Sequence, residues 1–172
     1  MSFDYNTLVY DRLQSDVIKA RNLREKVQSG ATLTQQEWDL YFAGLKGAYN
    51  GFNDLDRVEK CTIDITERLN NYGYHFTINA KDNWTLDEEI NIDDINRVKN
   101  NLQKIKDNFY VLINTPEIPS IEKTSINYID ANNIEKILFD INILIGRMEE
   151  GIRYCNCMYA GDDLGMPDTI NE

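Results

Sequence analysis

The segment Asp54-Leu55-Asp56-Arg57-Val58 is the key to the predicted architecture, because its pattern returns twice further along the chain. It reappears as Asp94-Ile95-Asn96-Arg97-Val98 and, more loosely, as Asn133-Ile134-Glu135-Lys136-Ile137, at a spacing of about forty residues. Each copy begins with Asp or Asn and continues with an aliphatic residue, an acidic or amide residue, a cation and a β-branched residue. A pattern that recurs at such a period indicates an internal structural repeat.

Apolar residues continue each copy in alternating steps of three and four, which places them on one face of a helix. The three series are Leu55, Val58, Thr62, Ile65 and Leu69, then Ile95, Val98, Leu102, Ile105 and Phe109, then Ile134, Ile137, Ile141, Leu144 and Met148. We therefore predict an all-α fold, a bundle of four to five helices. Its repeat helices are expected over about residues 54–72, 93–112 and 130–154.

The remaining segments add two shorter helices and one extended piece. Residues 11–27 have a helical apolar face that ends before Gly30, and Thr34-Gln35-Gln36-Glu37 has the spacing of a capping box at the start of a second helix. Residues 74–78 alternate as a β-strand does, which predicts a small extended or β appendage. It either pairs with residues 118–126 or lies extended on the bundle. We expect one domain over residues 1–160 and a flexible tail over residues 161–172.

Composition narrows the class of protein. The chain has 172 residues, with 18 Lys and Arg against 29 Asp and Glu, and its net charge is -11. Such a charge repels nucleic acid and anionic lipid surfaces, so neither is an expected partner. No apolar run has the length of a membrane span and no signal peptide is evident, which predicts a soluble protein made in the cytoplasm. The three cysteines, Cys61, Cys155 and Cys157, form no disulfide framework and are expected to be reduced.

Catalytic patterns are weak throughout the sequence. His75 is the only histidine, and no nucleophile is marked beside it. Cys155 and Cys157 have no second ligand pair to complete a metal site, and the acidic cluster over residues 87–94 lacks the glycine and ligand spacing of a calcium loop. No phosphate-binding glycine loop is present. We expect no enzyme activity, no cofactor and no metal.

Two groups of residues are candidates for an interface. Arg57 and Arg97 lie in the first turn of their helices, where the helix dipole disfavours a cation. They either form local ion pairs that fix the helix starts or dock a partner subunit. The aromatic candidates either fill the core or form a docking surface, and they are Trp38, Tyr41, Phe42, Tyr49 and Trp84.

Taken in order, several short motifs resemble those of small helical proteins from tailed phages and prophages of Gram-positive bacteria, encoded in the baseplate and tail-fibre region. The motifs cover nearly the whole chain, and their order is more specific than any one of them. They are Tyr10-Asp11-Arg12, Ser29-Gly30, Leu45-Lys46-Gly47-Ala48-Tyr49-Asn50 leading into Asp54-Leu55-Asp56-Arg57-Val58-Glu59, Asn83-Trp84-Thr85, Thr115-Pro116 with Ile118-Pro119, and Ala131-Asn132-Asn133-Ile134-Glu135-Lys136-Ile137-Leu138. The sequence departs from the family pattern at Asp56, where Asn is common, and in its cysteine-bearing end.

The resemblance implies a non-enzymatic structural or adaptor subunit of a phage tail, baseplate or tail-like particle, located in the virion and assembled with other subunits as a homo- or hetero-oligomer. It implies no catalytic residues. The alternative function is a receptor-binding module that recognises host cell-wall polysaccharide through Trp38, Trp84 and nearby tyrosines. A third interpretation is a regulatory protein encoded beside the particle genes.

Overall fold

The computed structural model describes residues 3–120 and 125–155, and in these ranges it is all-helical. The α-helices are α1 (Gln14–Gln28), α2 (Gln35–Ala43), α3 (Asp56–Asn71), α4 (Ile92–Asn108) and α5 (Tyr128–Cys155), with a 3-10 turn η1 (Tyr5–Thr7) and a π-helical turn η2 (Gly51–Leu55). The predicted all-α class is therefore confirmed. The predicted tail over residues 161–172 lies outside the described residues.

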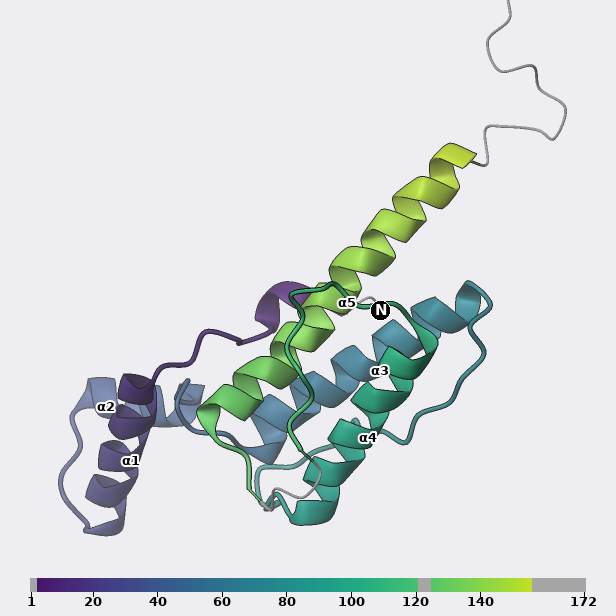
Figure 1. Cartoon of the computed structure of the whole chain (residues 1–172). Helices are drawn as coiled ribbons and strands as arrows, with labels where there is room; N and C mark the ends of the chain where they lie inside the picture. Colours follow the sequence, from purple (N-terminus) through teal and green to yellow (C-terminus); the bar gives the residue numbers. More distant parts are fainter. Residues whose placement is uncertain (1–2, 121–124, 156–172) are drawn as a thin grey trace, which may run out of the picture.

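Helices α3, α4 and α5 form a parallel bundle with their N-terminal ends together (Figure 1). Two ion pairs join these ends: Arg57 of α3 contacts Glu135 of α5 at 2.9 Å, and Arg97 of α4 contacts Glu59 of α3 at 2.7 Å. Because consecutive helices point the same way, the chain must return along the bundle before each of them. The return segments are residues 3–13, 72–91 and 109–127, of which residues 121–124 are not described.

Apart from η1 and short turns, the return segments contain no regular secondary structure, and among the described residues they form no strand, so the small β appendage is not confirmed. Residues 74–78 lie on the bundle instead, and side chains replace the missing strand partner. The amide of Asn70 accepts the Phe76 N–H at 3.0 Å and donates to the Phe76 carbonyl at 2.9 Å. In the same way, the side-chain amide of Asn101 accepts the Asn79 N–H at 3.1 Å and donates to the Asn79 carbonyl at 2.6 Å. Both backbone groups of an extended residue are thereby satisfied without a sheet.

The hydrophobic core lies between the three repeat helices, as their periodicity predicts. Leu55, Ile95 and Ile134 are 0%, 5% and 0% exposed. The return segments complete the core, since Leu8, Phe76 and Trp84 are buried in the same cluster. One cluster of contacts therefore includes residues from all three helices and from the segments between them.

The third repeat begins three residues earlier than the match between its sequence and the first two copies suggests. Asn91 and Asp94 form a reciprocal capping box at the start of α4, and Asn127 and Asp130 form the same box at the start of α5. The box at Asn50 contains one extra residue, which the π-helical turn η2 accommodates. Asp130, rather than Asn133, is thus the counterpart of Asp54 and Asp94. A shift of three residues keeps nearly the same helix face, so periodicity could not reveal it.

In the corrected register, a buried polar residue stands at the same place in each repeat. Glu59, Lys99 and Glu135 each follow the capping Asp by five residues and are 1%, 1% and 0% exposed. Each bonds to a return segment: Glu59 accepts from the Lys81 N–H, Glu135 accepts from the Val9 N–H, and Lys99 donates to the Ser120 carbonyl. The three units therefore share a helix, a cap and a polar contact to the extended segment.

Candidate assembly site

The first repeat unit contains an insertion that the other two lack. Residues 72–91 and 109–127 lead directly into the capping Asn of α4 and α5, whereas α1 and α2 intervene between Leu13 and Asn50. These two helices, called the arm below, stand beside the N-terminal end of the bundle (Figure 1). Three apolar residues of the arm, Ala20, Leu23 and Leu33, are buried without belonging to the bundle core, and they are called the arm core below.

Local interactions shape the arm. The predicted capping box at the start of α2 is present, since Thr34 Oγ1 accepts the Glu37 N–H and Glu37 accepts the Thr34 N–H. Glu37 also pairs with Lys26 of α1, which joins the two helices. Gly47 lies so close to α1 that a Cβ atom there would be 2.1 Å from the Asp16 carbonyl carbon and oxygen. The arm is therefore closed by one ion pair and one tight backbone contact.

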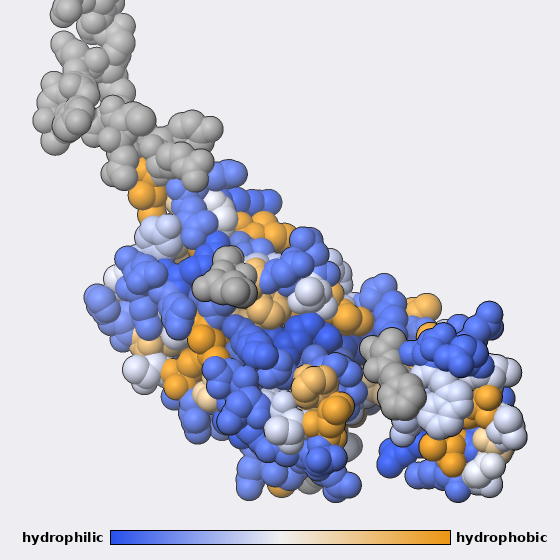
Figure 2. Space-filling view, turned by 180° about the vertical axis from the view of Figure 1, so that it is seen from behind, coloured by the Kyte–Doolittle hydropathy of each residue, from blue (hydrophilic) through white to orange (hydrophobic). Residues whose placement is uncertain are grey.

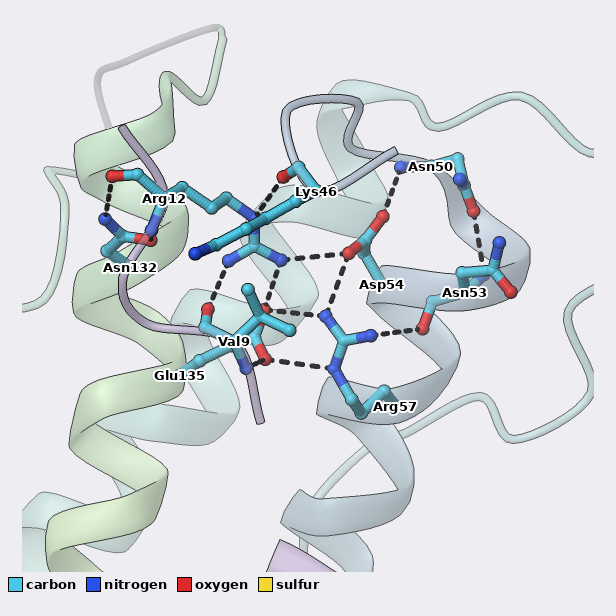
Figure 3. Close-up of polar contacts among 9 residues, drawn as sticks. All are labelled: Val9, Arg12, Lys46, Asn50, Asn53, Asp54, Arg57, Asn132 and Glu135. Carbon is cyan, nitrogen blue, oxygen red and sulfur yellow. Dashed lines mark hydrogen bonds and ion pairs between the residues drawn. The ribbon is translucent and has the colours of Figure 1, made fainter. Parts of the chain in front are cut away.

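Arg12 anchors both ends of the arm to the bundle (Figure 3). Its guanidinium donates to the carbonyls of Val9 and Lys46, which lie before and after the arm. The same group contacts Asp54 at 2.9 Å and Glu135 at 2.7 Å, at the starts of η2–α3 and α5. The side-chain amide of Asn132 accepts the backbone N–H of Arg12 at 3.0 Å and donates to the Arg12 carbonyl at 2.9 Å. A single residue, 3% exposed, thus connects the arm to two helices of the bundle.

Arg57 shares both carboxylates with Arg12. Its Nε donates to Glu135 at 3.0 Å, and its Nη2 contacts Asp54 at 2.8 Å. Burial opposes the charged form of Arg57, but hydrogen bonds and charge from Glu135 and Asp54 outweigh it and raise the pKa. Two cations and two carboxylates therefore form a mutually compensated cluster, which a buried set of charges requires. We call Arg12, Asp54, Arg57 and Glu135 the anchor cluster.

The anchor cluster holds segments together, because each of its two arginines uses four of its five N–H groups in bonds within the chain. A hollow lies between the arm and the bundle, lined in part by Arg12, Asp54 and Arg57. Every side-chain nitrogen of Arg12 and Arg57 already donates to a carbonyl or carboxylate oxygen. The arrangement is therefore suited to fixing the arm in place.

A second network occupies the start of α4. Arg97 contacts Glu59 at 2.7 Å and Asp94 at 2.8 Å, and the Trp84 indole N–H donates to Glu59 at 3.0 Å. Trp84 is only 5% exposed, and its ring also fills the space beside Gly51, where a Cβ would be 2.4 Å away. Of the two roles that the sequence left open for Trp84, the structure shows the core role, because the indole is buried and its N–H is satisfied.

Of the other predicted interface residues, some contact groups within the chain and others are exposed on the arm. Arg57 and Arg97 are mostly buried and form ion pairs within the chain, the structural role that the sequence left open. Tyr49 packs under Arg12, whose guanidinium carbon is 5.4 Å from the ring centre, and burial raises the pKa of its phenol. Trp38 and Tyr41 are 39% and 42% exposed on α2. The side chain of Phe42 lies outside the described residues.

The arm also exposes aliphatic residues that sequence reasoning missed. Leu13, Ile18 and Leu40 are 61%, 47% and 54% exposed. Helical phase is the signal that could have found Ile18, since it faces away from Ala20 and Leu23. Figure 2 shows the arm as a separate lobe at the lower right, on which apolar and weakly polar side chains reach the surface. These three residues, with Trp38 and Tyr41, form the exposed apolar set of the arm.

The structure also describes His75 and Cys61, which the sequence raised as candidates for catalysis and for disulfide formation. His75 is exposed and has a left-handed backbone, with φ of 49°. Cys61 is buried, and desolvation raises the pKa of its thiol, which favours the unreactive protonated form. Within residues 3–120 and 125–155 no group of His, Cys, Asp and Glu side chains is arranged to hold a metal ion. No helix in the described part of the chain has the length and apolarity to cross a membrane.

Comparisons with known proteins identified no relative: no family model matches the chain, and no curated protein or solved structure matches it.

Proposed function

We propose that this chain is a non-enzymatic structural or adaptor subunit of a phage tail, baseplate or tail-like particle, and that the arm attaches it to neighbouring subunits. The observation that carries the proposal is the contrast within the first repeat unit. The other two units pass directly from return segment to helix, whereas this unit supports an inserted pair of helices with an exposed apolar set. The phage assignment itself rests on the motif resemblance.

The physical properties of the arm support a docking role. Its exposed residues include an aromatic pair, Trp38 and Tyr41, whose rings meet edge to face at 6.1 Å between centroids. Exposed aromatic side chains supply large contact areas at low entropic cost, and they are enriched at interfaces. The anchor cluster fixes both ends of the arm before any partner arrives. Less conformational entropy is then lost on binding.

Repetition in a particle strengthens such a contact. A small exposed surface alone gives a weak interface. Many copies held on one particle bind as linked modules, so their effective concentration raises the overall strength of attachment. The subunit therefore needs only a modest contact at each arm.

Mass spectrometry of purified particles, combined with site-specific photocrosslinking, tests the proposal. A photoreactive amino acid at Leu40 of the arm should crosslink to a neighbouring subunit. The same residue placed at Leu86, which is 79% exposed on the bundle, is the matched control and should crosslink less. Absence of the chain from purified particles would favour the regulatory interpretation and contradict the proposal. Equal crosslinking from both positions would contradict the docking role of the arm.

The alternative is a receptor-binding module for cell-wall polysaccharide. The exposed pair Trp38 and Tyr41 favours it, because aromatic faces bind sugar rings, whereas the burial of Trp84 removes half of the predicted tryptophan contact. Saturable binding of the isolated chain to purified host cell walls, lost in the variant Trp38→Ala, would support this alternative over the adaptor role.

A further inference from the structure

The exposed apolar set of the arm lies next to a row of cations. Ile18, Arg21 and Arg24 follow one another at three-residue steps on α1, and all three are exposed. Neither arginine forms an ion pair with any residue in the described ranges. Helix α1 carries four cations against two carboxylates in a chain whose net charge is -11. This row is thus a basic and apolar surface on an acidic protein.

Residues 156–172 have the complementary composition. They contain four acidic residues and no Lys, Arg or His, and apolar residues stand beside the acids. The central part, Asp162-Asp163-Leu164-Gly165-Met166, places two carboxylates directly before Leu164 and Met166. A segment of this kind offers both charge and apolar side chains to a row such as Ile18, Arg21 and Arg24.

We propose that residues 156–172 of one copy bind the α1 surface of the arm of a second copy, so that copies join head to tail. This inference rests on the proposed function of the arm as a docking element and names its occupant. The contact is heterologous, because two different surfaces meet, and repetition of it gives a ring or an open chain of subunits.

The dimensions of the molecule exclude contact between Asp162 or Asp163 and the arm of the same copy. The arm is anchored at Asn132, near the start of α5, and α5 points away from it (Figure 1). From Asn132 to Cys155 the helix covers about 35 Å at about 1.5 Å per residue. Asp163 follows Cys155 by eight residues, a reach of at most about 29 Å when fully extended. The two carboxylates therefore meet an arm only on another copy.

Charge reversal with the full chain tests the contact. Arg21→Glu/Arg24→Glu makes the arm acidic, and Asp162→Lys/Asp163→Lys makes the segment basic. Sedimentation velocity at about 0.1 M salt should show concentration-dependent association of the unmodified chain, weakened at about 1 M salt, where the Debye length falls to about 3 Å. Each double variant alone should associate at least about tenfold more weakly, because two exposed ion pairs are replaced by repulsions.

The decisive measurement is the equimolar mixture of the two double variants. The acidic segment of one variant faces the unmodified basic arm of the other, and the basic segment faces the acidic arm. Association should therefore return in the mixture to within about threefold of the unmodified chain. The matched control is Lys60→Glu/Lys104→Glu on exposed positions of α3 and α4, which changes the net charge as much as the arm variant does and should leave association unaltered.

Three results would overturn the proposal: no association of the unmodified chain, an arm variant that associates as strongly as the unmodified chain, or a mixture that stays monomeric. Circular dichroism identifies variants that fail to fold. If the isolated chain stays monomeric while Leu40 still crosslinks to other subunits in particles, this inference fails and the proposed function stands. If copies associate through the arm but the chain is absent from purified particles, this inference stands and the proposed function fails.

Discussion

The bundle and the arm differ in what holds each of them together. The bundle buries complete side chains between three helices, and residues such as Val58, Leu102 and Ile141 are at most 1% exposed. The arm buries three residues of its own, each 6–8% exposed, and depends on the Arg12 contacts for its position. The arm therefore leaves exposed apolar side chains such as Ile18 and Leu40, whereas the repeat helices bury theirs. The orientation of the arm relative to the bundle is fixed by the anchor cluster, which lies outside the two arm helices.

The largest expected effect comes from breaking the anchor cluster. Glu135→Gln removes the charge that compensates both Arg12 and Arg57 in a site where Glu135 is 0% exposed. We expect a loss of about 3–5 kcal/mol in the free energy of unfolding, because buried cations are left partly uncompensated. Urea denaturation followed by circular dichroism measures this loss.

Glu149→Gln is the matched control for that experiment. Glu149 pairs with Arg68, but its side chain is 31% exposed, so we expect a loss of no more than about 1 kcal/mol. Equal losses in the two variants would show that burial does not distinguish the anchor cluster from a surface pair.

The second prediction separates the two cores. Ile141→Ala leaves a cavity between the repeat helices and should cost about 2–5 kcal/mol, lowering hydrogen-exchange protection throughout α3, α4 and α5. Leu23→Ala damages the arm core, and its effect should be confined to amides of α1 and α2. If Leu23→Ala lowered protection equally in the bundle, the arm would not be an independent unit.

The third prediction concerns the tight contact in the arm. A Cβ atom at position 47 would be 2.1 Å from backbone atoms of Asp16, so Gly47→Ala must displace the segment that closes the arm. We expect a cost of about 1–3 kcal/mol, as in other overpacked sites. Gly146→Ala is the control: a Cβ there meets nothing within 4 Å in α5, so the substitution should stabilise by about 0.5–1 kcal/mol. Thermal unfolding distinguishes the two signs.

The smallest effect is a pH dependence within the arm. The Lys26 hydrogen bond, with those from Thr34, lowers the pKa of Glu37 from 4.5 to about 2. A carboxyl whose pKa is lowered by folding stabilises the fold above its unfolded pKa, and this contribution is lost as the pH falls toward the folded value. In NMR spectra of the folded chain, the arm amide shifts that report Glu37 should therefore titrate with a midpoint near pH 2 instead of near pH 4.5. In Glu37→Gln that titration should be absent; its persistence would contradict the assignment.

The candidate site was only partly accessible to sequence reasoning. The bunching of aromatics identified Trp38 and Tyr41, which are exposed on the arm. The same bunching included Tyr49, and the tryptophan count included Trp84, although both side chains pack against charged groups of the bundle. Aromatic composition does not separate the two cases, because a large ring suits a core as well as an interface.

Features that depend on neighbours a few residues apart could be predicted from the amino-acid sequence. The alternating apolar steps specified the repeat helices, and Thr34 with Glu37 specified the start of α2. The parallel direction of the bundle, the register of its third repeat and the roles of Arg12 and Arg57 became evident only from the three-dimensional arrangement of the chain. The pairs Arg12–Glu135 and Arg57–Glu135 join residues 123 and 78 positions apart. Such contacts depend on the path of the whole chain, whereas helix periodicity and capping arise within a single turn.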